Sequence, residues 1–282
     1  MKAKLVPPCA YLGGKQRLAS QIVDVILSDN PNHKDSHFYD LCCGSGAISI
    51  ELINRGISPE QITMVDMSPW GLFWRDIGNG NFSCDVFNLL IENMPSNPED
   101  IQAYVKQLYN QPPNDGLLEN AVYKFLILQS ASFGSKPIWL NGDKWSSAFF
   151  RNYWTPTETS NRRSPVNPMM PMPKTLYQRV ESISHEMRGI TGICQNVYDL
   201  TIPENSIVYI DPPYKGTTGY GFDLDYVQFT NRQVVPTYIS EGYRFSEHAV
   251  LMSDSRRKGG VSGERKSENQ EWLNKFNVRN HF

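Results

Sequence analysis

The segment that most constrains this chain is a short apolar run that ends at Asp211-Pro212-Pro213-Tyr214. Residues 207–210 read Ile-Val-Tyr-Ile, which is typical of a buried strand. The two prolines end that strand, because neither can donate a hydrogen bond to a neighbouring strand. A carboxylate, a backbone carbonyl and an aromatic ring are therefore presented together at the carboxyl end of a strand, where open α/β sheets bind ligands.

This combination suits the exocyclic amine of a nucleobase, which is a weak nucleophile because its lone pair is delocalised into the ring. Two acceptors that hold both amine hydrogens favour a tetrahedral nitrogen whose lone pair can attack. The Asp211 carboxylate and the Pro212 carbonyl can be those acceptors, and Tyr214 can stack on a base taken out of a duplex. The alternative is a strand end with an N-capping Asp211 and a packed Tyr214.

Two glycine turns precede this segment. Gly13-Gly14-Lys15 stands at the start of a helix predicted over 16–27, where backbone N–H groups and an ammonium can hold an anion. A surface turn explains the same residues. A second turn, Gly44-Ser45-Gly46, follows a short apolar strand and precedes a helix predicted over 47–54. It is a nucleotide-type loop without the third glycine of a dinucleotide fingerprint, and packing alone explains it equally well.

Two further acids stand near the ends of predicted strands. Asp66 follows a strand over 61–65, where it can accept hydrogen bonds from a ribose diol; it can also cap the next segment, as Ser68 can. Asp199 follows a strand over 190–197, which would bring it beside a nucleotide in the same cleft. The alternative for Asp199 is a turn cap.

The middle of the chain is basic and aromatic. Residues 138–145 predict a hairpin with an Asn-Gly turn, and residues 130–180 carry a net charge of +5 interleaved with aromatic side chains. That composition is typical of an insert that contacts DNA, although a solvated, aromatic-packed subdomain would look similar. The predicted DNA-binding residues are Lys136, Lys144, Arg151, Arg162 and Arg163.

Together these residues resemble the Dam-like family of DNA adenine methyltransferases. The family's N-terminal motif, an aromatic residue followed by small-Gly-Gly-Lys, is similar to Tyr11-Leu-Gly-Gly-Lys15, and its cofactor loop, an acid followed by Gly-x-Gly, is similar to Asp40-Leu-Cys-Cys-Gly-Ser-Gly46. Its Asp-Pro-Pro-Tyr motif appears in full at Asp211–Tyr214, and its two cofactor acids match Asp66 and Asp199.

The resemblance implies transfer of a methyl group from S-adenosylmethionine to the N6 amine of adenine in double-stranded DNA, with base flipping and without a metal. The cofactor would be held by Tyr11, Gly13, Gly14, Lys15, Asp40, Gly44, Gly46, Asp66, Asp199 and Asp211. The flipped base would be received by Asp211, Pro212, Pro213 and Tyr214.

The implied fold is α/β, a Rossmann-like doubly wound methyltransferase sheet with an inserted, mainly helical target-recognition domain that carries a β-hairpin. The catalytic domain would comprise residues 1–76 and 190–282, and the recognition domain residues 77–189. Because the chain stops soon after a strand predicted over 248–255, we expect either that the sheet lacks its last strand pair or that the chain is truncated. Further predicted elements are helices over 98–109, 117–130, 176–187 and 231–241, and a short amphipathic element over 270–276.

The composition indicates the cellular compartment and excludes some kinds of binding site. The chain has 282 residues, a net charge of −2 and five cysteines without a CxxC pair, so we expect no zinc and reduced thiols. No apolar run is long enough to cross a membrane, and we expect a cytoplasmic monomer.

Two competing functions stay open. Methyltransferases of RNA, protein glutamine or the cytosine amine use related loops, commonly with a residue other than Asp at position 211. A DNA-binding homologue without catalysis is the candidate from another class.

Overall fold

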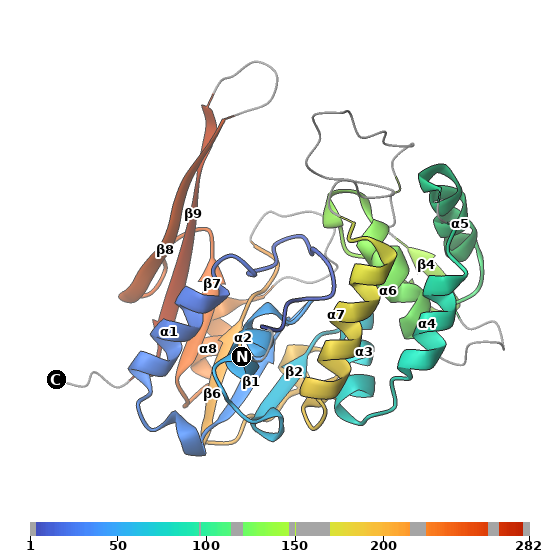
Figure 1. Ribbon diagram of the computed structural model, residues 1–282. Coiled ribbons are helices and arrows are strands. Elements are labelled where there is room, and N and C mark those ends of the chain that lie inside the picture. The colour runs from blue at the N-terminus through green and yellow to red at the C-terminus, as the bar shows by residue number, and fades with distance from the viewer. Residues whose placement is uncertain are drawn as a thin grey trace.

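A seven-stranded sheet in the order β5-β2-β1-β6-β7-β9-β8 organises the fold (Figure 1). The computed structural model describes residues 4–95, 97–113, 121–146, 150, 170–214, 224–258 and 265–278. Neighbouring strands from β5 to β7 are parallel, whereas β9 pairs antiparallel with both β7 and β8. The strands are β1 (His37–Leu41), β2 (Ile62–Val65), β5 (Thr191–Ile193), β6 (Ser206–Ile210), β7 (Thr237–Glu241), β8 (His248–Lys258) and β9 (Arg265–Phe276).

Alternating side chains of the strands enter two separate hydrophobic clusters. Phe38 and Ile207 pack into the larger cluster, together with α1, α2, α3 and the helices that follow. Val208 and Ile210 point to the other face, where Phe229 of α8 meets them. Every residue of β6 is buried, as expected for a parallel strand covered on both faces. The helices are α1 (Ala19–Asp29), α2 (Ala47–Asn54), α3 (Pro69–Gly78), α4 (Cys84–Glu92), α5 (Pro98–Asn110), α6 (Ala121–Ala131), α7 (Pro173–Glu186) and α8 (Tyr226–Asn231), with 3₁₀ turns η1 (His33–Asp35), η2 (Pro59–Gln61), η3 (Phe133–Ser135) and η4 (Val197–Asp199).

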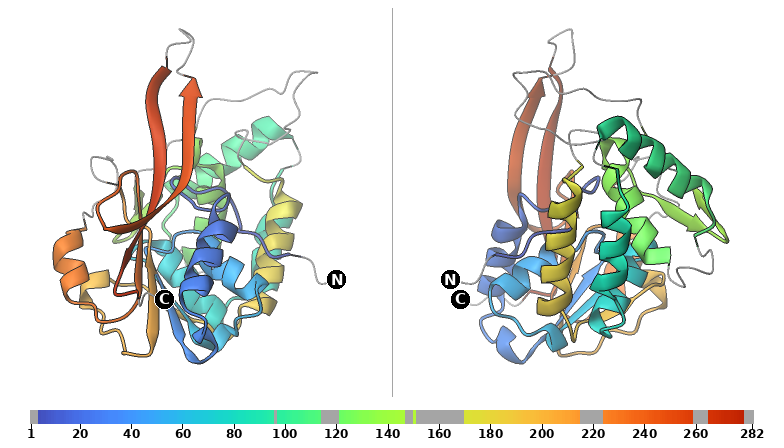
Figure 2. Two further views of the ribbon diagram at one scale, coloured as in Figure 1. Left: turned by 90° about the vertical axis from the view of Figure 1, so that its left-hand side faces the viewer. Right: turned by 45° about the vertical axis from the view of Figure 1, so that its right-hand side comes forward.

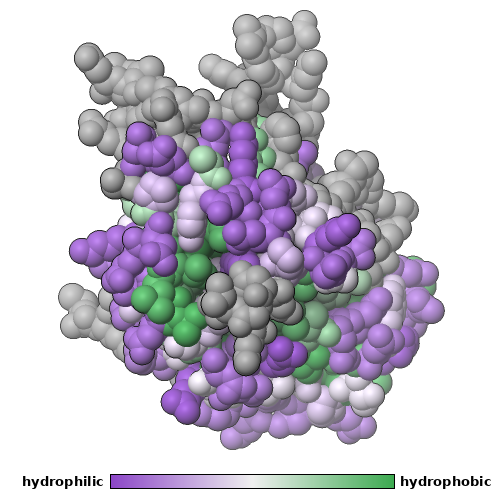
Figure 3. Space-filling view, turned by 90° about the vertical axis from the view of Figure 1, so that its right-hand side faces the viewer, coloured by the Kyte–Doolittle hydropathy of each residue, from purple (hydrophilic) through white to green (hydrophobic). Residues whose placement is uncertain are grey.

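The chain between β2 and β5 forms a block of helices at one end of the sheet (Figure 1). Side chains of α4 to α7, among them Phe87, Phe125 and Val180, share one hydrophobic cluster with α3. The predicted hairpin is present as β3 (Trp139–Asn141) and β4 (Lys144–Ser146), and Gly142 supplies the positive φ of +60° in its turn. On this side of the molecule, patches of hydrophobic residues interrupt a mostly hydrophilic surface (Figure 3).

The C-terminal strands correct one prediction. Instead of ending without its last strand pair, the sheet is completed by β8 and β9, whose register pairs Val250 with Leu273. Leu273 is buried, and the Asn274 side chain accepts hydrogen bonds from Phe245 N and Ser246 N, which fixes the chain between β7 and β8. The two strands project well beyond the rest of the sheet (Figures 1 and 2). Residues 256–266 are polar and basic, so they lack the alternating apolar side chains from which a strand is predicted. The extension was therefore not predicted from the sequence.

The prediction of a helix over 231–241 was wrong. The helix is α8, which ends at Asn231, and residues 237–241 form β7. Pro236 separates the two: it has no N–H for a helix, and its carbonyl accepts from Val208 N at 2.9 Å, at the start of the β6–β7 pairing. The helix predicted over 47–54 is confirmed with both bounds as α2.

Within the described residues, no helix has the length and apolar content needed to span a membrane. In the same residues, no cluster of three His, Cys, Asp or Glu side chains is arranged to hold a metal ion.

Candidate active site

The candidate site is a cavity of about 500 Å³ at the carboxyl ends of β1 and β6. The strand order reverses between these two strands, because the chain proceeds to β2 on one side and to β7 on the other. Such a switch point leaves a crevice for a ligand. The Asp211 N–H donates to Leu41 O at 3.2 Å, which joins the loops after the two strands. The predicted residues on the cavity wall are Tyr11, Gly13, Gly14, Lys15, Asp40, Gly44, Asp66, Asp211, Pro212, Pro213 and Tyr214.

The glycine loop after β1 is held by two aromatic side chains. Gly44 has φ +49°, and a Cβ there would lie 2.8 Å from the Tyr11 ring. Gly46 has φ +77° at the start of α2, and a Cβ there would lie 2.4 Å from the Trp74 ring. Trp74 also donates from Nε1 to Gly44 O at 2.8 Å. Gly46 therefore supports the loop from beneath and does not itself line the cavity.

Asp66 braces the same loop from the end of β2. Its Oδ2 accepts from Gly44 N and its Oδ1 from Ser68 N, both at 2.8 Å. Burial raises the pKa of Asp66, and the hydrogen bonds from Ser68 and Gly44 oppose that shift. Ser68 is the N-cap of α3, since its side chain accepts from Trp70 N. Asp66 also lines the cavity, so it belongs both to the support of the loop and to the cavity wall.

Asp40, on β1, is a second buried acid on the cavity wall. Its Oδ2 accepts from Ser49 Oγ at 2.7 Å and from Ser49 N at 3.1 Å. Burial raises the pKa of Asp40 to about 7, against these hydrogen bonds, and the charges of Asp211 and Asp66 add to the rise. A cation that binds beside Asp40 would therefore lower this pKa and favour the ionised carboxylate.

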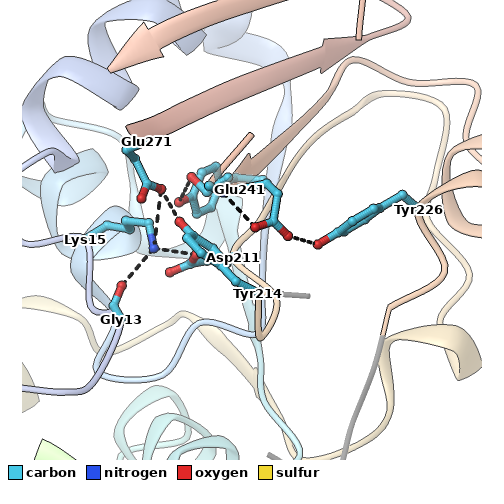
Figure 4. Close-up of polar contacts among 10 residues, drawn as sticks. Gly13, Lys15, Asp211, Tyr214, Tyr226, Glu241 and Glu271 are labelled. Atoms are coloured by element: carbon cyan, nitrogen blue, oxygen red, sulfur yellow. Dashed lines mark hydrogen bonds and ion pairs between the residues drawn. The ribbon is translucent and has the colours of Figure 1, made fainter. Parts of the chain in front are cut away.

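Lys15 reaches the loop that follows β6. Its side chain is only 6% exposed, and its ammonium lies 2.6 Å from Asp211 Oδ1, 2.8 Å from Gly13 O and 4.8 Å from the centre of the Tyr214 ring (Figure 4). The anion at this glycine turn is therefore the carboxylate of Asp211. Burial raises the pKa of Asp211, Lys15 opposes the shift, and the charge of Glu241 adds to it.

Two glutamates beside this pair were missed by the sequence analysis. Glu271, on β9, has Oε1 3.6 Å from Lys15 Nζ and accepts a hydrogen bond from the Tyr214 hydroxyl (Figure 4). Glu241 ends β7 and accepts from the Tyr226 hydroxyl and, at 2.7 Å, from Gly242 N. The pairing of β6 with β7 brings Glu241 near Asp211, and the pairing of β7 with β9 brings Glu271 there; no local pattern encodes either pairing.

Asp199 is an exposed residue at the end of η4 and is not on the cavity wall, so its predicted contact with the cofactor stays a prediction. The same segment lines the cavity with Gln195 and Val197 instead. Met67 also lines the cavity and is 41% exposed. These three residues contribute two apolar side chains and one amide to the cavity wall.

The basic insert approaches the cavity through its hairpin. Trp139 of β3 lines the cavity, and Leu12 N donates to Ser135 O at 2.9 Å, which ties the insert to the N-terminal turn. Lys136 and Lys144 are exposed on this part of the chain. Arg151, Arg162 and Arg163 lie outside the described residues.

The Rossmann-like sheet defines an α/β protein, and the acidic cavity at its switch point, beside the β1 and β6 loops, is a candidate site for a small ligand. A family model described as D12 class N6 adenine-specific DNA methyltransferase matches residues 11–121. The match confirms the resemblance to DNA adenine methyltransferases and indicates an enzyme of that adenine-specific class. It covers the Lys15 turn, the glycine loop and Asp66, and ends before Asp211. No curated protein matches the chain.

Proposed function

We propose that this protein transfers a methyl group from S-adenosylmethionine to the N6 amine of an adenine flipped out of double-stranded DNA. The observation that carries the proposal is the pairing of Lys15 with Asp211 in a cavity that also contains the glycine loop. Lys15 occupies Oδ1 of Asp211, and among the described residues no hydrogen bond reaches Oδ2. One carboxylate oxygen is thus available to an amine beside the Pro212 carbonyl.

The charge of the cavity wall supports a cationic cofactor. Asp40, Asp66 and Asp211 line the wall, and among the described lining residues Lys15 is the one basic side chain that faces them. Phosphate groups of a dinucleotide would be repelled by this excess of carboxylates, whereas a sulfonium and an ammonium group would be attracted. S-adenosylmethionine carries both cations, and when bound it supplies the methyl group.

The remaining lining residues suit the other parts of that cofactor. Asp66 has two acceptor positions in use, and a carboxylate offers about four, so it can still accept from a ribose diol. Met67 and Val197 can cover the two faces of an adenine ring, and the Gln195 amide can bond its edge. Asp40 lies near Asp211 and can hold an ammonium group.

The catalytic loop would receive the target base. Asp211 and the Pro212 carbonyl hold the two amine hydrogens, which directs the nitrogen lone pair toward the methyl group. Lys15 opposes the effect of burial on Asp211 and so favours the ionised form that accepts a hydrogen bond. Tyr214 stacks on the base, and the pyrrolidine of Pro213 keeps the loop extended. Catalysis would come from positioning and from preorganised acceptors.

DNA would be recognised by the block of residues 77–189. The hairpin of this block carries the exposed Lys144, follows the exposed Lys136 and contributes Trp139 to the cavity wall, so a duplex bound here would present a base to Tyr214. Contacts of Lys136 and Lys144 with phosphates would position the duplex without reading its sequence. Arg151, Arg162 and Arg163 are proposed to add to this surface.

The test is incorporation of labelled methyl groups into duplex DNA, followed by identification of the modified base. Wild-type protein should label DNA on N6 of adenine and should not label RNA or a glutamine peptide. Asp211→Ala should abolish labelling, while Glu51→Gln, which removes a buried carboxylate on α2 away from the cavity, should not. An Asp211→Ala protein with the wild-type rate would refute the proposal.

A further inference from the structure

Glu271 does not line the cavity, but its carboxylate contacts two residues that do, Lys15 and Tyr214 (Figure 4). Its side chain is 15% exposed, and it comes from β9, far outside the segment that matches the family model. Any movement of Glu271 must therefore reach the reacting groups through those two side chains.

We propose that Glu271 is a positioning residue for methyl transfer. Through the Tyr214 hydroxyl it fixes the ring on which the base stacks, and through Lys15 it fixes the carboxylate that accepts the amine. This inference rests on the proposed function, because it concerns the same reaction.

The donors and acceptors around Lys15 support this role. An ammonium has three donors, and three acceptors surround this one: Gly13 O at 2.8 Å, Asp211 Oδ1 at 2.6 Å and Glu271 Oε1 at 3.6 Å. The first two are hydrogen bonds, and the third is a longer ion pair that restrains the remaining direction. The same Oε1 accepts from Tyr214, so one atom of Glu271 couples the ring to the ammonium.

A buried negative charge on Glu271 lowers the stability of the folded protein. Two carboxylates share one buried ammonium, and burial raises the pKa of Glu271 while Lys15 opposes the shift. A neutral glutamine could accept the Tyr214 hydrogen bond without that cost. The proposed role therefore depends on the acceptor that this position offers to Tyr214 and Lys15.

The chain contains a matched control outside the cavity. Asp29 accepts from Lys275 at 2.9 Å and from the Tyr238 hydroxyl at 3.2 Å, so it also joins a cation to a tyrosine. Lys275 lies on β9, as Glu271 does, and none of these three residues lines the cavity. Asp29→Asn therefore removes a comparable carboxylate, at the end of α1, that contacts the same strand.

The experiment compares wild type, Glu271→Ala, Glu271→Gln, Tyr214→Phe and Asp29→Asn, with kcat and KM measured for DNA methylation. Glu271→Ala should lower kcat roughly 10- to 100-fold with the KM for S-adenosylmethionine unchanged, because a small displacement of reacting groups has that effect. Glu271→Gln should recover most of the loss, since it keeps the acceptor for Tyr214. In the Tyr214→Phe background Glu271→Ala should cost less than in wild type, because the two side chains act through one contact.

A second readout does not depend on activity. Acylation of Lys15 by acetic anhydride, followed by mass spectrometry, should increase in Glu271→Ala relative to wild type and stay unchanged in Asp29→Asn. The inference is overturned if Glu271→Ala matches Asp29→Asn in kcat and in Lys15 labelling, or if Glu271→Gln is no better than Glu271→Ala. Absence of methylation by wild type would instead refute the proposed function, and the labelling of Lys15 would still test the contact.

Discussion

Replacing Lys15 by methionine tests whether the buried ion pair sets the charge of the catalytic loop. The substitution keeps the length of the side chain and removes the cation that lies 2.6 Å from Asp211 and 3.6 Å from Glu271. With an effective dielectric constant of about 20, the lost attraction to Asp211 alone would be about 6 kcal/mol. A carboxyl group can avoid that cost by taking up a proton, which restores the net charge of the group.

Protonation limits the loss of stability. Taking up one proton at pH 7 by a carboxyl with a reference pKa of 3.8 costs about 4 kcal/mol, and at pH 5 about 1.6 kcal/mol. The folded variant then binds a proton that its unfolded state does not, so its stability falls as the pH rises. We expect Lys15→Met to cost about 4 kcal/mol at pH 7 and less than half of that at pH 5.

Urea unfolding of both proteins at pH 5 and pH 7 measures this difference. Lys275→Met is the control, because Lys275 and its partner Asp29 are more exposed as a pair and solvent screens them more. Methyl transfer by Lys15→Met should increase with pH while its stability decreases, since only the ionised Asp211 accepts the amine. A loss of stability that is equal at the two pH values would refute the reasoning.

Three further outcomes are expected. Gly46→Ala should destabilise the protein by at least about 2 kcal/mol in a denaturant titration, because its Cβ would clash with the Trp74 ring at 2.4 Å and its φ is +77°; unchanged stability would contradict the loop geometry. Binding of S-adenosylmethionine at pH 7 should release protons, because the pKa of Asp40 is raised to about 7 and a bound cation lowers it; calorimetry in buffers of different ionisation enthalpy should show this, and Asp40→Asn should show less. Lys136→Ala and Lys144→Ala should each weaken DNA binding across sequences and reduce the salt slope by about 1, and an unchanged slope would remove that residue from the interface.

The sequence predicts those parts of the site that depend on neighbouring residues. The strand before Asp211 and the helix over 47–54 follow from periodicity and from the turn residues at their ends. The glycine loop follows as well, because Gly44 and Gly46 mark positions of positive φ. These features need only short-range information, and the structure confirms them.

Contacts between distant strands cannot be predicted from neighbouring residues. Glu271 meets Tyr214 across 57 residues, and the contact depends on the register that places Glu241 opposite Trp272. A shift of one residue would turn Glu271 to the opposite face of β9. The position of Asp199 shows a related effect, since a 3₁₀ turn lets Gln195 and Val197 reach the cavity while Asp199 stays exposed.

The role of Lys15 shows why the complete sheet matters for the chemistry. A lysine at a glycine turn predicts a contact with an anion of a ligand, yet its buried partners are carboxylates of the protein itself. The turn comes before β1, Asp211 follows β6, and Glu271 belongs to β9, so the ion-pair group can form only when all three segments are in place. A chain in which β9 has not paired with β7 would therefore retain the glycine loop and the pair of Lys15 with Asp211, but would lack the contacts of Glu271 with Lys15 and Tyr214.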